Sequence, residues 1–341
     1  MTRTRTIMLG LAALALVVFA TAAGAAKPGN GASTGTGQVF FPNPVASLQD
    51  QTLTDQKDAD YAALQPAYRR VTLTNLDGSG TLTGDYANIR NETGNNAYSP
   101  DNVFVYTRSD DRFEQVMAYY WITEAQKYFQ DLGFGSGKTY RPVNEESQDL
   151  RINQWGQDNS YSWDKHDIIR LGKGGVDDAE DAEVILHEYG HAVHDAQGVD
   201  LQGVEAGGIG EGFGDYLAVT ISNHIAPTPD APCVADWDAV SYTSTVPHCL
   251  RRIDTSAHYP ESLSTTSVHR NGLIWSASLW DIRNAIGRVQ ADTTILEAHF
   301  SMGVVTTMPY AAEIIVQTAQ KLYDAGIAAE VRLAFEARGI L

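Results

Sequence analysis

Basic residues are scarce in this sequence. Its 341 residues include 24 Lys and Arg against 42 Asp and Glu, which gives a formal net charge of −18 at pH 7. Proteins that bind nucleic acid neutralise phosphates with clustered Lys and Arg, so this composition excludes a nucleic-acid partner. The same shortage argues against binding to an anionic membrane surface, and we interpret the acidity as a feature that favours solubility.

Cysteine is almost absent from the chain. Cys233 and Cys249 are the two that it contains, and they lack the CxxC spacing that is typical of many zinc sites. This argues against a metal site built on paired cysteines. In an exported protein two such cysteines are expected to pair, which would close a loop over residues 234–248.

Long apolar runs are also missing, apart from one at the N-terminus. Residues 7–20 are apolar except for Gly10, and they follow Arg3 and Arg5. The run is shorter than the ~20 residues of a membrane span, and small residues follow it, as in a cleaved secretory signal. We therefore predict a signal peptide over 1–26, a secreted mature protein and no membrane association after cleavage. The alternative is an uncleaved anchor.

The remaining chain has the pattern of a globular protein, with 43% hydrophobic residues overall. Residues 27–37, rich in Gly, Ser and Thr, predict a flexible leader. Alternating apolar residues and frequent turns predict a β-rich N-terminal lobe over 38–200 that ends in a long helix, and helical spacing predicts a mostly helical lobe over 201–341. This order indicates the α+β fold class. The predicted helices cover residues 110–132, 177–198, 271–285, 309–325 and 328–337.

The long central helix carries the HExxH pattern. Its members are His187, Glu188 and His191. Two residues four apart project from the same helix face, so both imidazoles can bind one zinc ion. Glu188 lies beside the metal without binding it, where a carboxylate can take a proton from a water molecule.

A catalytic zinc site keeps three protein ligands, so a third must come from elsewhere. An extended HExxHxxGxxH motif would need Gly at position 194 and His at position 197, whereas the sequence has His194 and Gln197. His194 lies about 10 Å further along the helix axis than His187, too far to share its metal. The remaining candidate is Glu211, in the segment Gly-Glu-Gly-Phe-Gly-Asp.

The spacing of these residues resembles that of the thermolysin-like and fungalysin-like zinc peptidases. In both, the HExxH motif is followed by a Glu, here Glu211 after nineteen intervening residues, and by an Asp four positions later, here Asp215. The resemblance implies that Glu211 is the third zinc ligand and that Asp215 holds His187. It also implies a two-lobed fold with the zinc cleft between the lobes, in a monomeric endopeptidase that acts on polypeptides.

Two further segments resemble parts of this family. Ser-Val-His-Arg-Asn-Gly-Leu-Ile-Trp, residues 267–275, resembles the segment whose histidine faces the metal, so His269 would donate a hydrogen bond to the oxyanion. The segment at Asn159 and Ser160 resembles the edge strand that pairs with substrate, which makes these residues candidate substrate contacts. An ordinary edge strand is the alternative.

Acidic residues gather just before the HExxH motif. Asp177, Asp178, Asp181 and Glu183 could bind calcium, as the resemblance suggests. Acids in this position are also favoured by the dipole at the start of a helix, and we prefer that interpretation.

Three other functions compete with the endopeptidase. Related zinc aminopeptidases have eighteen rather than nineteen residues between the second His and the Glu. Glu188 and His191 also match half of a di-iron site, but the chain shows no convincing second half. The third alternative is an inactive, metal-binding secreted module, which the intact Glu188 disfavours.

Overall fold

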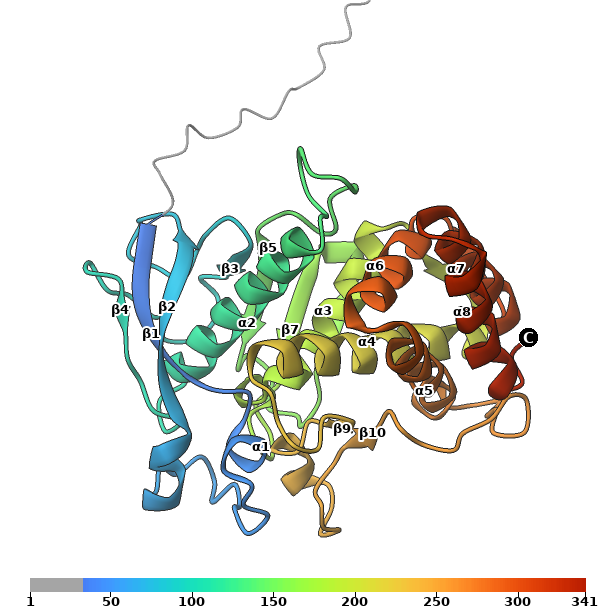
Figure 1. Ribbon diagram of the computed structural model, residues 1–341. Helices are drawn as coiled ribbons and strands as arrows, with labels where there is room; N and C mark the ends of the chain where they lie inside the picture. Colours follow the sequence, from blue (N-terminus) through green and yellow to red (C-terminus); the bar gives the residue numbers. More distant parts are fainter. Residues whose placement is uncertain (1–32) are drawn as a thin grey trace, which may run out of the picture.

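The computed structural model describes residues 33–341 of the chain (Figure 1). The predicted signal peptide and the first part of the predicted leader lie outside this range. The expectation of a flexible leader is wrong for residues 33–37, which begin strand β1 (Ser33–Phe40). The glycines of this segment serve close packing: a Cβ on Gly37 would lie 2.8 Å from Val116 of the neighbouring helix.

The N-terminal part is built on two sheets with a helix, α2 (Arg112–Asp131), lying across them. In the first sheet β1 lies between β2 (Tyr68–Leu76), to which it is antiparallel, and β4 (Val103–Phe104). The strands of the second sheet, in spatial order, are β3 (Ala87–Ile89), β5 (Gln148–Ile152), β7 (Ile168–Leu171) and β6 (Tyr161–Trp163). β6 is antiparallel to β7 and forms an edge of this sheet.

Helices dominate the rest of the described chain, and Figure 1 shows α5 to α8 at the side away from β1, with α3 and α4 between them and the sheets. They are α3 (Ala182–Ala196), α4 (Gly203–Ile225), α5 (Val268–Ile286), α6 (Arg288–His299), α7 (Met308–Leu322) and α8 (Ala325–Ala337). The short elements are α1 (Pro44–Leu48), η1 (Ala62–Ala67), η2 (Asp164–His166), η3 (Asp178–Glu180), η4 (Asp238–Ser241), β8 (Asp200–Leu201), β9 (Cys233–Val234), β10 (Arg251–Arg252) and β11 (Val304–Val305). Sheets followed by helices confirm the α+β class, while a lobe boundary at residue 200 stays a prediction.

Helix α4 was not among the helices predicted from the sequence. Its glycines nevertheless explain why it packs so closely against α3 and α5. Glycine disfavours a helix interior by about 1 kcal/mol relative to alanine. Here the glycines let three helices approach one another. A Cβ on Gly212 would lie 2.5 Å from the carbonyl oxygen of Gly272 in α5, and one on Gly190 of α3 would lie 2.9 Å from Cα of Gly214.

The predicted disulfide between Cys233 and Cys249 is present. It joins β9 to the segment just before β10, and the two strands are paired, with Arg251 opposite Val234. The covalent link therefore holds Arg251 beside the central helices. Across residues 33–341, no helix combines the length and apolar character that a membrane crossing would need.

Close contact between α3 and α4 leads to a stability prediction. We expect Gly190→Ala to lower the free energy of unfolding by about 1–3 kcal/mol, because the added methyl group overpacks a backbone-to-backbone contact. Gly156→Ala is the matched control, since a Cβ there meets nothing within 4 Å. Urea unfolding followed by circular dichroism measures both, and equal midpoints for the two variants would show that the contact is not tight.

Candidate metal centre and active site

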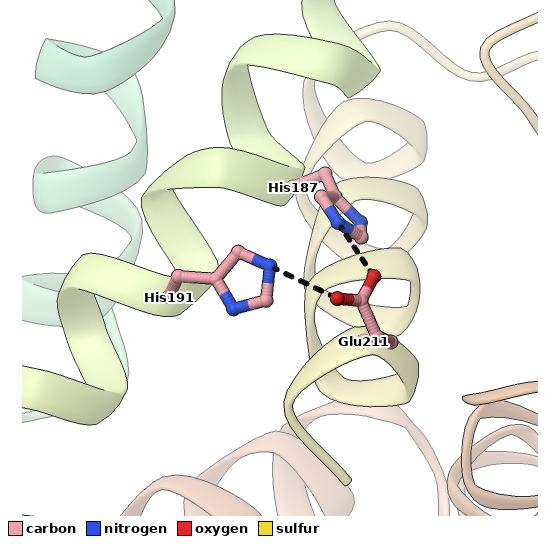
Figure 2. Close-up of side chains that lie close together, drawn as sticks. All are labelled: His187, His191 and Glu211. Carbon is pink, nitrogen blue, oxygen red and sulfur yellow. Dashed lines mark ion pairs between the residues drawn. The ribbon is translucent and has the colours of Figure 1, made fainter. Parts of the chain in front are cut away.

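Three side chains from two neighbouring helices point towards one another (Figure 2). His187 and His191 lie one turn apart on α3, and Glu211 reaches them from α4. Nε2 of His187 is 3.5 Å from Oε2 of Glu211, and Nε2 of His191 is 3.9 Å from Oε1. One ligand atom from each residue lies within 4.8 Å of the other two.

This trio fits a tetrahedral metal ion. Ligand atoms about 2.0–2.1 Å from a zinc ion are separated from one another by about 3.3 Å, close to the spacing found here. Oε2 of Glu211 is buried and has no hydrogen-bond partner among the described residues. An orphaned carboxylate oxygen facing two imidazoles is what a cation would satisfy.

The charges of the trio also suit a cation. Burial, followed by the neighbouring charge of His187, lowers the pKa of His191 to about 4, so that this ring is neutral and free to bind a metal. Burial opposes the charge of His187, but the hydrogen bond to Asp215 and the nearby carboxylate of Glu211 outweigh burial and raise the pKa of His187 to about 10. A metal ion would take the place of that proton, because a ligating imidazole must be neutral.

Asp215 contacts the first imidazole of the trio on the side away from Glu211. Nδ1 of His187 lies 2.8 Å from Oδ1 of Asp215, so the ring donates a hydrogen bond there and turns Nε2 towards Glu211. Arg251 in turn donates two hydrogen bonds to the same carboxylate, both 2.7 Å long. Burial opposes the charge of Asp215, but Arg251 and His187 hold its pKa below the usual range.

Arg251 is the part of the site that sequence reasoning missed. It lies 36 residues beyond Asp215, and nothing in its immediate neighbours distinguishes it from Arg252. Its nearness to Cys249, which the disulfide holds against β9, is the one signal that could have drawn attention to it.

Glu188 and His269 flank the candidate metal centre. Glu188 is 7% exposed, lines the same cleft as His187, and has its pKa raised to about 7 by burial. His269 stands in the first turn of α5, where Ser267 caps the helix by accepting a hydrogen bond from the N–H of Arg270. Its side chain is 61% exposed, with Nε2 3.3 Å from Oε2 of Glu211. Both residues can therefore reach a molecule bound in the cleft.

The candidate substrate contacts lie at the end of this cleft where β6 begins. Asn159 and Ser160 line it, and Asn159 is exposed. The hydroxyl of Ser160 donates a hydrogen bond to Asp178 and accepts one of 3.2 Å from the N–H of Gly172. Ser160 is thus already bonded within the chain, and a substrate role for either residue stays a prediction.

His194 lies apart from the metal trio. Its Nε2 is 3.3 Å from Nε2 of His299, and its ring stacks on Phe213 with 4.4 Å between centroids. Burial lowers the pKa of His194 well below the usual value and that of His299 to about 3. The two rings are therefore neutral and form part of the packing between α3, α4 and α6.

The acids considered for calcium are Asp177, Asp178, Asp181 and Glu183. Asp181 accepts hydrogen bonds from three backbone N–H groups, including that of Glu183, and so caps α3. Glu183 accepts from the hydroxyl of Ser222 and the N–H of Ala235. Within residues 33–341 only Asp178 of these four belongs to a convergent acidic group, together with Asp158 and Asp238.

The chain was compared with known proteins. A model of the fungalysin metallopeptidase family (M36) matches residues 72–339. The extracellular metalloproteinase MEP of Fusarium vanettenii is 26% identical over 161 residues, which cover 41% of this chain and 24% of that protein. Extracellular metalloproteinase 4 of Trichophyton tonsurans is 28% identical over 142 residues, which cover 38% of this chain and 20% of that protein. The match thus spans a quarter or less of these relatives.

Among solved structures, the chain resembles the precursor of protealysin, a metalloproteinase from Serratia proteamaculans. The TM-score is 0.56 at 14% sequence identity, and the match covers 66% of this chain and 78% of that one. At this identity the likeness shows the fold alone. It confirms the predicted two-lobed, thermolysin-like architecture.

The hydrogen bonds of Arg251 predict an effect on metal affinity. We expect Arg251→Met to weaken zinc binding about 10–100-fold, because Asp215 then loses the partner that fixes its hold on His187. Arg252→Met is the control, since Arg252 pairs with Asp230 and Asp254 outside the site. Competition with a chromogenic chelator measures both affinities, on protein shown to be folded by circular dichroism. Equal affinities would contradict the positioning role of Arg251.

Proposed function

The chain belongs to the fungalysin metallopeptidase family, and on that basis we propose that it is a secreted, zinc-dependent endopeptidase that hydrolyses peptide bonds in polypeptide substrates. The matched relatives are named extracellular metalloproteinases, which agrees with the signal peptide expected at residues 1–26. The single observation that carries the proposal is the convergence of His187, His191 and Glu211, with Glu188 in the same cleft.

The donor set favours zinc over calcium or magnesium. Two imidazole nitrogens and one carboxylate are zinc ligands in many hydrolases, whereas calcium and magnesium prefer oxygen donors throughout. A zinc ion held there would supply a Lewis acid that polarises the scissile carbonyl and lowers the pKa of a water molecule to about 7. Because protein donors already satisfy Asp181 and Glu183, we assign calcium no role at these two residues.

Three side chains at the site each have a separate role in the proposed reaction. Glu188 accepts the proton of the attacking water and passes it to the nitrogen of the departing amine. His269 donates a hydrogen bond to the oxygen that becomes negative as the carbonyl is attacked. Asp215 keeps His187 in the tautomer whose Nε2 faces the metal.

Substrate binding follows from the free edge of β6. An extended peptide can add to an exposed sheet edge by main-chain hydrogen bonds, with side chains entering pockets at alternate positions. β6 runs from Tyr161 to Trp163 at the edge of its sheet, and Asn159 precedes it in the cleft. A peptide that adds to a strand edge in this way does not need a free chain end in the cleft, so this mode of binding suits cleavage inside a polypeptide. All of the residues named belong to one chain, so we propose that the protein acts as a monomer.

The proposal predicts that Glu188→Gln abolishes hydrolysis, with a fall of about 10²–10⁴-fold or more, while zinc remains bound. The amide cannot accept the proton, but the three ligands are untouched. Casein digestion and metal analysis by mass spectrometry measure the two properties. Glu313→Gln serves as control, because Glu313 pairs with Arg332 on the surface of α7 and α8.

Two results would overturn this account. Loss of zinc together with activity in Glu188→Gln would make Glu188 a ligand rather than a base. Release of N-terminal residues alone, without internal cleavage of casein by the unaltered protein, would favour an aminopeptidase. A protein that binds zinc and hydrolyses neither substrate would be an inactive metal-binding module.

A further inference from the structure

A second group of acids lies beside the proposed catalytic residues. Asp158 precedes β6, Asp178 lies in η3 and Asp238 lies in η4, and one carboxylate oxygen of each lies within 4.8 Å of the other two. We refer to these three residues as the acidic recess. They come from segments far apart in the sequence, so the fold alone brings them together.

The recess is largely buried and has no positively charged partner within the described chain. Asp178 and Asp238 are 2% and 3% exposed. Oδ1 of each of the three acids is buried without a hydrogen-bond partner in the described chain, and no Lys or Arg of residues 33–341 forms an ion pair with any of them. Burying an ionised carboxylate without a partner lowers the stability of the folded protein by several kcal/mol. Three such carboxylates together therefore point to a cationic group that the described chain does not provide.

The recess opens towards the catalytic residues. Asp178 and Asp238 line the same cleft as His187 and Glu188. Arg251 also lines this cleft, and its positive charge acts against the rise in the pKa of Asp238, but its guanidinium is engaged by two hydrogen bonds to Asp215 and forms no ion pair with the recess. A substrate whose cationic group fills the recess can therefore also reach Glu188.

Part of the cleft wall is apolar. Val184 of α3, Ala235 after β9 and Leu250 before β10 line it alongside the acids. An apolar wall leading to carboxylates matches a side chain with a methylene stem and a cationic end, which is the chemistry of Lys and Arg. The ammonium group of Lys carries three donors, one for each carboxylate of the recess.

We propose that the acidic recess binds the cationic side chain of a Lys or Arg residue next to the scissile bond, and so directs cleavage to basic positions. This inference rests on the proposed peptidase function and names its substrate class. Burial raises the pKa of Asp178 to about 7 and also raises the pKa of Asp158 and Asp238, as expected of carboxylates that lack their positive partner.

A divalent cation is the other occupant with this charge. Calcium takes six to eight oxygen ligands, whereas the three aspartates have six carboxylate oxygens between them and the hydroxyl of Ser160 already donates to one of those of Asp178. A resident metal would also leave the apolar wall without a role. We therefore favour the substrate side chain and treat the metal as an outcome of the test.

The test maps cleavage sites in an unfolded protein by mass spectrometry. We expect Lys or Arg at one fixed position beside the cleaved bond, with kcat/KM for a Lys peptide about 10²-fold above that of its norleucine analogue. Asp238→Leu should remove this preference and favour apolar side chains. Asp230→Leu is the control, because Asp230 pairs with Arg252 and is outside the recess.

A binding measurement separates this inference from the proposed function. The zinc-loaded Glu188→Gln protein should bind the Lys peptide more tightly than the norleucine peptide in calorimetry, even if the unaltered protein hydrolyses neither. This comparison varies the peptide and keeps the protein the same, so it remains valid even if the Asp238→Leu variant does not fold. Equal binding of the two peptides, cleavage without regard to charge, or calcium binding that Asp238→Leu abolishes would overturn the proposal.

Discussion

The contact between α3 and α4 is the constraint on which the rest of the site depends. Gly190 meets Gly214 with no room for a side chain between the two backbones. At that separation each of two imidazoles on one helix comes within 4 Å of a carboxylate on the other. Asp215 lies one turn beyond Glu211 and so reaches the far nitrogen of His187. A wider spacing of these helices would remove the metal ligands and their support together.

Much of the helical framework could be predicted from apolar periodicity. The expected helices near residues 110–132, 177–198 and 271–285 correspond to α2, α3 and α5 with ends shifted by a few residues. α4 escaped prediction because it is buried on almost every side and rich in glycine, so it shows neither an amphipathic stripe nor a helical propensity. The glycines at the start of β1 were misread for the same reason, since glycine permits close packing as well as flexibility.

The candidate site was predictable only where its members are close in sequence or follow a known spacing. His187, Glu188 and His191 share one helix, and Glu211 with Asp215 follows at a fixed interval. Arg251 and the acidic recess could not be found in this way, because their roles arise from contacts between distant segments. The sequence shows the acids near residue 180 as a single run, whereas the structure bonds Asp181 and Glu183 internally and turns Asp178 towards Asp158 and Asp238.

The negatively charged side chains of the cleft therefore fall into two groups, those paired within the chain and those left without a partner. The negative charge of Asp215 is matched by Arg251, while Glu211 and the acidic recess each keep an oxygen without a partner for a cation to fill. The measurement that bears most directly on this account is anomalous diffraction from crystals of the zinc-loaded protein at the zinc absorption edge. We predict one strong peak within about 2.0–2.2 Å of Nε2 of His187, Nε2 of His191 and a carboxylate oxygen of Glu211. A peak elsewhere, or one that the carboxylate of Glu211 does not reach, would contradict the central claim.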